Sequence, residues 1–163
     1  MSLRFIIDGY NLVHNPDFPA PDGKISVHRA LAVLIRHYNL CGKSSNSVTV
    51  VWDGFAPSQM SRDLYSGVIF VFSSDISADD KIRNMLEEAE NTKNIIVVSD
   101  DKQVQASARL FKARYQRIEE FLKPAAKAFR QKRDGASLSD KLTHAQQCQI
   151  NKELLNLWCE KKK

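Results

Sequence analysis

Short apolar runs alternate along the chain with longer amphipathic or polar segments. The runs are rich in β-branched and aromatic residues, which is typical of strands buried in a sheet. Five runs are predicted to be strands: residues 3–8 (LRFIID), 48–53 (VTVVWD), 68–73 (VIFVFS), 94–101 (NIIVVSDD) and 114–118 (RYQRI). Three intervening segments are predicted to be helices: residues 25–41, 77–92 and 101–113.

This alternation predicts an α/β fold. We expect a mainly parallel sheet of about five strands with helices on both faces, in a three-layer, Rossmann-like arrangement. The 163 residues suit a single core. We place that core in residues 1–122 and expect residues 123–163 to form a basic helical extension packed on it or tethered to it.

The extension is predicted from a change in charge. Residues 1–122 contain 14 Lys and Arg against 15 Asp and Glu, whereas residues 123–163 contain 10 against 4. A basic tail favours a polyanionic partner, and a solvated helix surface is an equal alternative. Residues 143–163 are predicted to form a last helix that packs on the body, with a partner-binding helix as the alternative. The densest candidates for phosphate contacts are Lys123, Lys127, Arg130, Lys132 and Arg133.

Acidic residues follow the predicted strands. Asp8, Asp53 and the pair Asp100–Asp101 come directly after apolar runs, and Asp79 with Asp80 opens a helix just after the third strand. Because the carboxyl ends of parallel strands meet at one edge, separate stretches of sequence deliver these acids to the place where ligands bind. Each aspartate taken alone is more often a turn or capping residue than a ligand. Their coincidence favours a functional site.

Crowded carboxylates repel one another, so they must raise their pKa values or bind cations. Oxygen ligands without His or Cys companions suit Mg²⁺ or Mn²⁺ better than zinc. Such a site supports phosphodiester hydrolysis, in which one metal activates water and a second, about 3.5–4 Å away, stabilises the leaving oxygen. His14 lies near the first motif. A surface or substrate-contact role and a catalytic role are equal alternatives for it.

Several other classes fit the sequence less well. A dehalogenase-type phosphatase needs a second aspartate two residues after Asp8, where this chain has Tyr10, and no Gly-rich nucleotide-binding motif is present. No apolar run is long enough to span a bilayer, and no signal-peptide pattern opens the chain, so we expect a cytoplasmic protein. The three widely spaced cysteines are expected to be reduced thiols.

The motifs resemble those of a known family. Residues 6–15 (IIDGYNLVHN) are similar to the opening motif of the NYN domain, a branch of the PIN-like nuclease superfamily. The segments VVWDGFAP, ISADDKIRNMLEE and IIVVSDDKQVQ, in that order, resemble the later motifs of its YacP-like group. The resemblance covers roughly residues 3–122. It implies a PIN-like fold and an RNA-cleaving site that depends on Mg²⁺ or Mn²⁺.

The resemblance also implies roles for individual residues. Asp8 would be the first metal ligand, with Asn11 orienting it and Ser99 contacting the site. Asp80, with Asp79 beside it, matches the acidic pair that opens the central helix, and Asp101 matches the aspartate after the fourth strand. The register within the pairs Asp79–Asp80 and Asp100–Asp101 stays open. Asp53 matches an acidic position found in many related nucleases. The implied catalytic residues are Asp8, Asp80 and Asp101.

The leading hypothesis is therefore a metal-dependent endoribonuclease. The alternative is a PIN-like module that docks on RNA or the ribosome with little or no cleavage. The basic extension would serve RNA or ribosome docking in either case, or would be simply an extra helix. PIN-like domains often pair, so a homodimer is consistent with the resemblance.

Overall fold

The computed structural model describes residues 2–19, 26–57 and 67–134. One sheet contains the five strands, β1 (Arg4–Asp8), β2 (Ser47–Trp52), β3 (Ile69–Phe72), β4 (Ile95–Val98) and β5 (Arg114–Gln116). Its order is β3-β2-β1-β4-β5, and every neighbouring pair is parallel. The predicted α/β class with a five-stranded parallel sheet is therefore confirmed.

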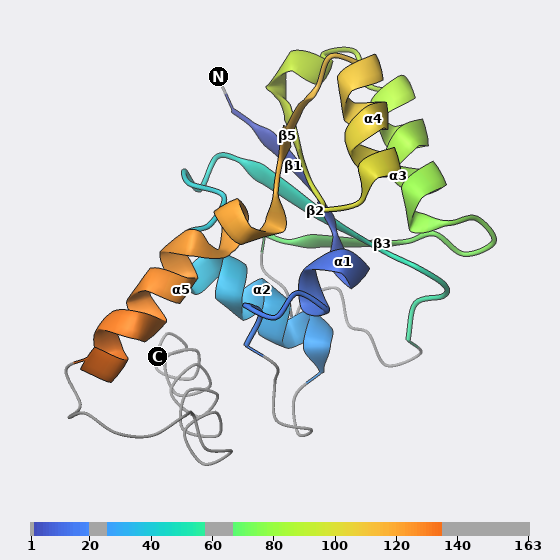
Figure 1. The fold of residues 1–163 in the computed structure, drawn as a ribbon. Coiled ribbons are helices and arrows are strands. Elements are labelled where there is room, and N and C mark those ends of the chain that lie inside the picture. Colours follow the sequence, from blue (N-terminus) through green and yellow to red (C-terminus); the bar gives the residue numbers. More distant parts are fainter. Residues whose placement is uncertain (1, 20–25, 58–66, 135–163) are drawn as a thin grey trace.

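Helices cover both faces of the sheet (Figure 1). The three predicted helices are present as α2 (Val27–His37), α3 (Ala78–Glu87) and α4 (Lys102–Leu110). The structure adds α1 (Gly9–Val13), the short 3₁₀ helix η2 (Thr92–Asn94) and α5 (Ile118–Asp134), which starts before the predicted extension. Figure 1 shows α3 and α4 on one face, and α1, α2 and α5 on the other.

The two faces bury separate cores because successive strand residues point to opposite sides. Phe5 and Ile7 of β1 belong to the larger core, which lies under α1, α2 and α5. Ile6, between them, belongs to the smaller core under α3 and α4. Near-continuous apolar strands such as residues 5–7 are therefore buried on both sides, as expected of a parallel sheet.

Helix α5 crosses position 122, where the sequence suggested a boundary. Phe121 and Leu122 are each 1% exposed, and Ala125 is also buried, all in the larger core. The first part of α5 is thus an integral layer of the domain. The predicted last helix of residues 143–163 lies outside the described residues.

Two smaller expectations concern other parts of the chain. Cys41 is a buried free thiol, and burial raises its pKa to about 12. Among the described residues, no helix is both long and apolar enough to cross a membrane.

The sheet order fixes where a site can form. β1 lies between β2 and β4, so the chain crosses to one side of β1 after its first strand and to the other side later. Such a switch point opens a crevice outside the carboxyl ends of the central strands. Asp8 is the last residue of β1 and thus stands at this point.

Candidate active site at the carboxyl edge of the sheet

Asp8 is the most buried carboxylate among the described residues, with 2% of its surface exposed. Its Oδ1 accepts a hydrogen bond from the Asn11 backbone N–H at 3.0 Å, and its Oδ2 accepts from Asn11 Nδ2 at 2.7 Å. Ser99 Oγ donates to the same Oδ2 at 2.9 Å, and in turn accepts from the Asp101 N–H at 3.0 Å. These donors fix the orientation of the carboxylate and offset the cost of burying it.

The close approach of Gly9 to Trp52 explains why a glycine follows Asp8. A Cβ at this position would lie 2.7 Å from two ring carbons of Trp52, closer than any real Cβ contact. The missing side chain lets α1 begin directly on β2, immediately after β1 ends. Helix α1 was not predicted from the sequence, because a helix of five residues is too short to give an amphipathic repeat.

Each strand-end aspartate also caps a helix. Asp8 caps α1, and Asp101 caps α4 by accepting from the N–H groups of Gln103 and Val104 at 2.6 and 3.3 Å. Asp53 Oδ1 reaches the first N–H of α3, at Ala78, over 2.7 Å. Asp100, described next, does the same for α5. The capping role and the site role therefore coexist in the same side chains.

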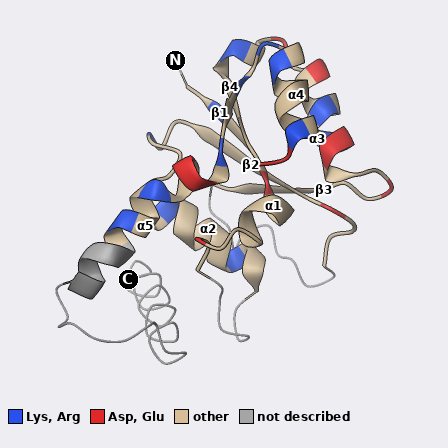
Figure 2. Cartoon of the chain, in the orientation of Figure 1, with Lys and Arg blue, Asp and Glu red and all other residues tan. Residues whose placement is uncertain are grey.

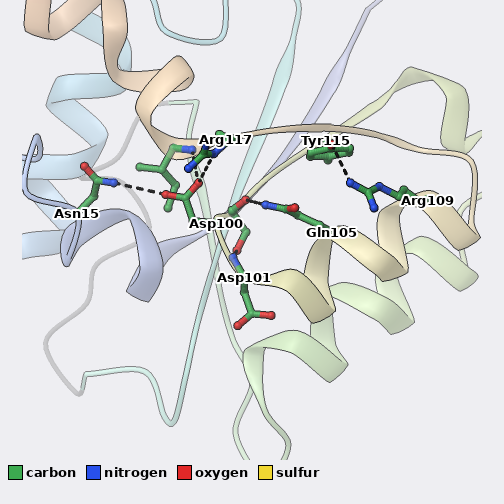
Figure 3. Close-up of polar contacts among 9 residues, drawn as sticks. Asn15, Asp100, Asp101, Gln105, Arg109, Tyr115 and Arg117 are labelled. Carbon is green, nitrogen blue, oxygen red and sulfur yellow. Dashed lines mark hydrogen bonds and ion pairs between the residues drawn. The ribbon is translucent and has the colours of Figure 1, made fainter.

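Asp100 and Asp101 serve different parts of the structure, although they are neighbours in sequence. Asp100 Oδ1 accepts from the first N–H of α5, at Ile118, at 3.2 Å, and lies 3.6 Å from Arg117 Nε. Its Oδ2 accepts from Asn15 Nδ2 at 3.5 Å. Figure 3 shows the Asp100 side chain directed toward Asn15 and Arg117, whereas that of Asp101 points away from them. Asp101 thus lies on the side of α3 and α4.

Asp79 is the acid around which the others gather. Burial is the main cause that raises the pKa of Asp79 to about 6, followed by the negative charges of Asp101, Asp8, Asp53 and Asp80, in that order. Asp100 is absent from these causes. The four residues that repel Asp79 come from three strand ends and one helix, so the structure does gather acids that the sequence scatters.

Asp80, by contrast, faces outward. Its side chain is exposed, and its Oδ2 accepts a hydrogen bond from Ser77 Oγ at 2.8 Å. Its backbone N–H donates back to the same hydroxyl at 3.1 Å. This reciprocal pair stabilises the start of α3. On geometry, Asp79 is closer to the role that the resemblance assigned to Asp80.

The donor set fits a hard divalent cation. Its side chains are carboxylates with a single hydroxyl and an amide nearby, and these are the ligands of Mg²⁺ and Mn²⁺. The aspartates around Asp79 repel it because negative charge is in excess there, and a bound divalent cation would neutralise that charge. As the side chains stand, no three His, Cys, Asp or Glu residues in the described part of the chain are arranged to hold a metal ion.

The basic candidates lie on α5. Lys123 and Lys127 are exposed on this helix, while Arg130, Lys132 and Arg133 belong to its last turns, where the structure describes no side chains. Figure 2 shows basic residues along α5, and acidic residues where α3 begins and near the ends of β1 and β4. The described part of α5 therefore presents lysines on the helix that Asp100 caps.

The comparisons with known proteins can be set against this geometry. The model of the YacP-like NYN domain matches residues 5–162. The chain therefore belongs to the YacP-like NYN family. This family is a group of PIN-like nuclease domains, and its match extends beyond the residues 3–122 that carried the resemblance.

Two solved structures share the fold of this YacP-like chain. Rae1 (YacP) from Bacillus subtilis is 20% identical, with a TM-score of 0.58 over 97% of this chain and 92% of that chain. Its W164L mutant is 22% identical, with a TM-score of 0.54 over 83% and 80%. The search of curated proteins found no match.

Proposed function

We propose that this YacP-like NYN protein is an endoribonuclease that cleaves RNA phosphodiester bonds with Mg²⁺ or Mn²⁺. The single observation that carries the proposal is the environment of Asp79, where burial first, and then the negative charges of four other aspartates, raise the pKa of the carboxyl group. A protein core gains no stability from such repulsion, whereas a cation site needs it. Family membership adds the nuclease class.

The proposed ligands are Asp8, Asp79 and Asp101, with Asp53 and Asp80 at the periphery. Bound Mg²⁺ or Mn²⁺ would neutralise a phosphodiester and lower the pKa of an attacking water. Asn11 and Ser99 hold Asp8 as a hydrogen-bond acceptor in one orientation, which preorganises the deepest ligand. Asp100 is left out of this set because it is not among the acids that repel Asp79, and because Arg117 Nε lies 3.6 Å from its Oδ1.

A second candidate function is an RNA- or ribosome-binding module without cleavage. One observation favours it: every strand-end aspartate also caps a helix, so folding alone gives a reason to retain these acids. Ribosome docking, a homodimer and a cytoplasmic location remain predictions from the sequence.

Cleavage of an RNA with single-stranded and structured regions tests the proposal. Wild type and Asp8→Asn are compared in EDTA, Mg²⁺ and Mn²⁺. We expect cleavage only by wild type with metal, since the amide of the variant lacks the charge of the deepest ligand. Glu87→Gln, at the far end of α3, makes the same acid-to-amide change away from the site and should cleave normally.

Two results would decide against the nuclease. Full activity of Asp8→Asn would show that the acids are not the catalytic centre. RNA binding without cleavage in any metal would favour the binding module. Circular dichroism of both variants checks that neither change unfolds the protein.

A further inference from the structure

Tyr10 is a large aromatic residue that the fold leaves uncovered on α1, the helix that Asp8 caps. It lies on α1, two residues after Asp8, and 55% of its surface is exposed. Its ring packs against the ring of His14, with 4.0 Å between centroids and 31° between planes. We name this pair the Tyr10–His14 shelf. Asp8, the most buried acid, caps the same helix, so we ask which kind of ligand the shelf could contact.

Hydrogen bonds hold the helix that carries the shelf. His14 Nδ1 lies 2.9 Å from the Tyr10 carbonyl oxygen, which restrains the imidazole as well as the helix turn. At the start of α1, Asp8 caps the helix through Asn11, and just beyond its end Asn15 donates to Asp100. Both ends of the short helix are therefore tied to strand ends. A ring that already packs on a neighbour loses less entropy when a flat partner stacks on it than a ring without such a contact.

The charge around the shelf limits the kind of partner. The neighbouring aspartates repel a phosphodiester, so a nucleic acid gains little from its backbone here unless a cation is bound. Helix α1 itself carries no charged residue. An aromatic shelf can instead hold a nucleobase, because stacking does not depend on the charge of the site and every base has a flat face.

We propose that the Tyr10–His14 shelf stacks an unpaired nucleobase of the RNA whose phosphodiester reaches Asp8. A base in a duplex is already stacked on both faces, so only a single strand or loop offers a free one. The inference rests on the proposed function for the identity of the nucleic acid. The role of Tyr10 is positioning, since its ring would touch the base and not the reacting atoms.

Binding is measured apart from cleavage, in Ca²⁺, which takes the same oxygen ligands as Mg²⁺ and neutralises the acids, and a gel checks that the RNA stays intact. The probe is a short single-stranded RNA carrying one 2-aminopurine, whose fluorescence falls when it stacks. It is compared with the same RNA annealed to its complement. The variants are Tyr10→Phe, which keeps the ring, and Tyr10→Leu and Tyr10→Ala, which remove it. Tyr115→Ala removes another exposed tyrosine, which packs on Arg109 (Figure 3), and serves as the matched control.

We expect Tyr10→Ala and Tyr10→Leu to weaken single-strand binding by about 5- to 100-fold and to abolish the quenching. Tyr10→Phe and Tyr115→Ala should bind like wild type, and duplex binding should not change. Equal loss for both RNAs, or no loss on ring removal, would overturn the inference. No RNA binding by wild type would do the same.

The design separates this inference from the proposed function. Ring-dependent binding by a protein that cleaves under no metal would support the shelf and remove the nuclease. Metal-dependent cleavage with unchanged binding by Tyr10→Leu would keep the nuclease and remove the shelf. Thermal unfolding of the Leu variant, which retains apolar bulk, checks that the change is confined to the ring.

Discussion

Neighbouring aspartates in this protein have different tasks. Asp79 and Asp80 are adjacent on α3, and one step along a helix turns the side chain by about 100°. Asp79 therefore points among the other acids, while Asp80 pairs with the Ser77 hydroxyl. The same division separates Asp101 from Asp100 after β4. The direction of each single side chain therefore separates the aspartates that lie together from those that stabilise helix starts.

The raised pKa of Asp79 predicts a pH-dependent stability. Because the folded state raises this pKa from 3.8 to about 6, the native protein holds the proton more tightly than the unfolded chain. Stability is therefore lost as pH rises from about 4 to 6 and then levels off. We expect Asp79→Asn to have a higher Tm than wild type at pH 7.5 in EDTA, and a similar Tm near pH 4.

Thermal unfolding across that pH range measures the effect. Asp75→Asn, which changes an exposed aspartate before α3, is the control and should follow wild type. Added Mg²⁺ should raise the Tm of wild type more than that of Asp79→Asn, because the cation relieves the repulsion. Parallel pH profiles for wild type and Asp79→Asn would contradict the raised pKa of Asp79.

The assignment of Asp101 over Asp100 gives a second prediction. Asparagine caps helices as well as aspartate does, so Asp101→Asn and Asp100→Asn should both fold. We expect Asp101→Asn to lose cleavage by about 100-fold or more, since it removes a ligand charge. Asp100→Asn should stay close to wild type. The ratio of their kcat/KM values on one RNA measures this difference, and the reverse order would show that Asp100 is the ligand.

At the scale of elements, strand ends organise helix starts. The parallel sheet brings the ends of β1, β2 and β4 together, and the carboxylates there satisfy the first N–H groups of α1, α3, α4 and α5. For α3 and α5 the capping carboxylate comes from a distant part of the chain. These two hydrogen bonds cross the edge of the sheet and hold one helix on each face. The acids therefore support the fold even before any ligand binds.

Loss of the distant cap should weaken the docking of α5. Asp100→Ala removes the acceptor for the Ile118 N–H and for Asn15, and we expect it to lower the free energy of unfolding by about 0.5–2 kcal/mol. Asp100→Asn should lose less. Urea unfolding gives both values. A stability of Asp100→Ala equal to that of wild type would mean that α5 needs no cap from β4.

At the scale of the whole molecule, α5 is both a structural and a charged element. Its first turn carries Glu119 and Glu120, the exposed Lys123 and Lys127 follow, and its buried residues fill part of the larger core. Phe121, Leu122 and Ala125 anchor that helix, so deleting the chain after Phe121 would remove core residues together with basic ones. The contribution of the basic residues is therefore better tested by substitution.

Lys123 and Lys127 supply that test, because both are exposed. If each contacts a phosphate, replacing both with alanine should weaken RNA binding about equally for all sequences. The plot of log K against log salt has a negative slope, and its magnitude should decrease by about 1.4, since each single-strand contact contributes about 0.7. Binding measured at several salt concentrations gives the slope. An unchanged slope would leave α5 with a purely structural role.

Much of this protein could be predicted from the sequence. The β-branched runs and the helical segments between them determined the strands, their parallel arrangement and the edge at which Asp8, Asp53 and Asp101 meet. The IIDGYN and SDD motifs resembled the family that the comparison confirmed. These features are local, so they are visible in the order of residues along the chain. The five-residue α1 and the start of α5 at Ile118 lacked such a local signal.

The different environments of the two residues in each acidic pair arise only in the tertiary structure. Helix phase directs Asp79 inward, and the arrival of Arg117 and Ile118 draws Asp100 away from the site. The exposure of Tyr10 and its packing on His14 depend on α1, whose position depends on the contact of Gly9 with Trp52. A sequence determines which residues follow a strand, but side-chain direction and charge crowding arise from elements that meet only in the folded chain.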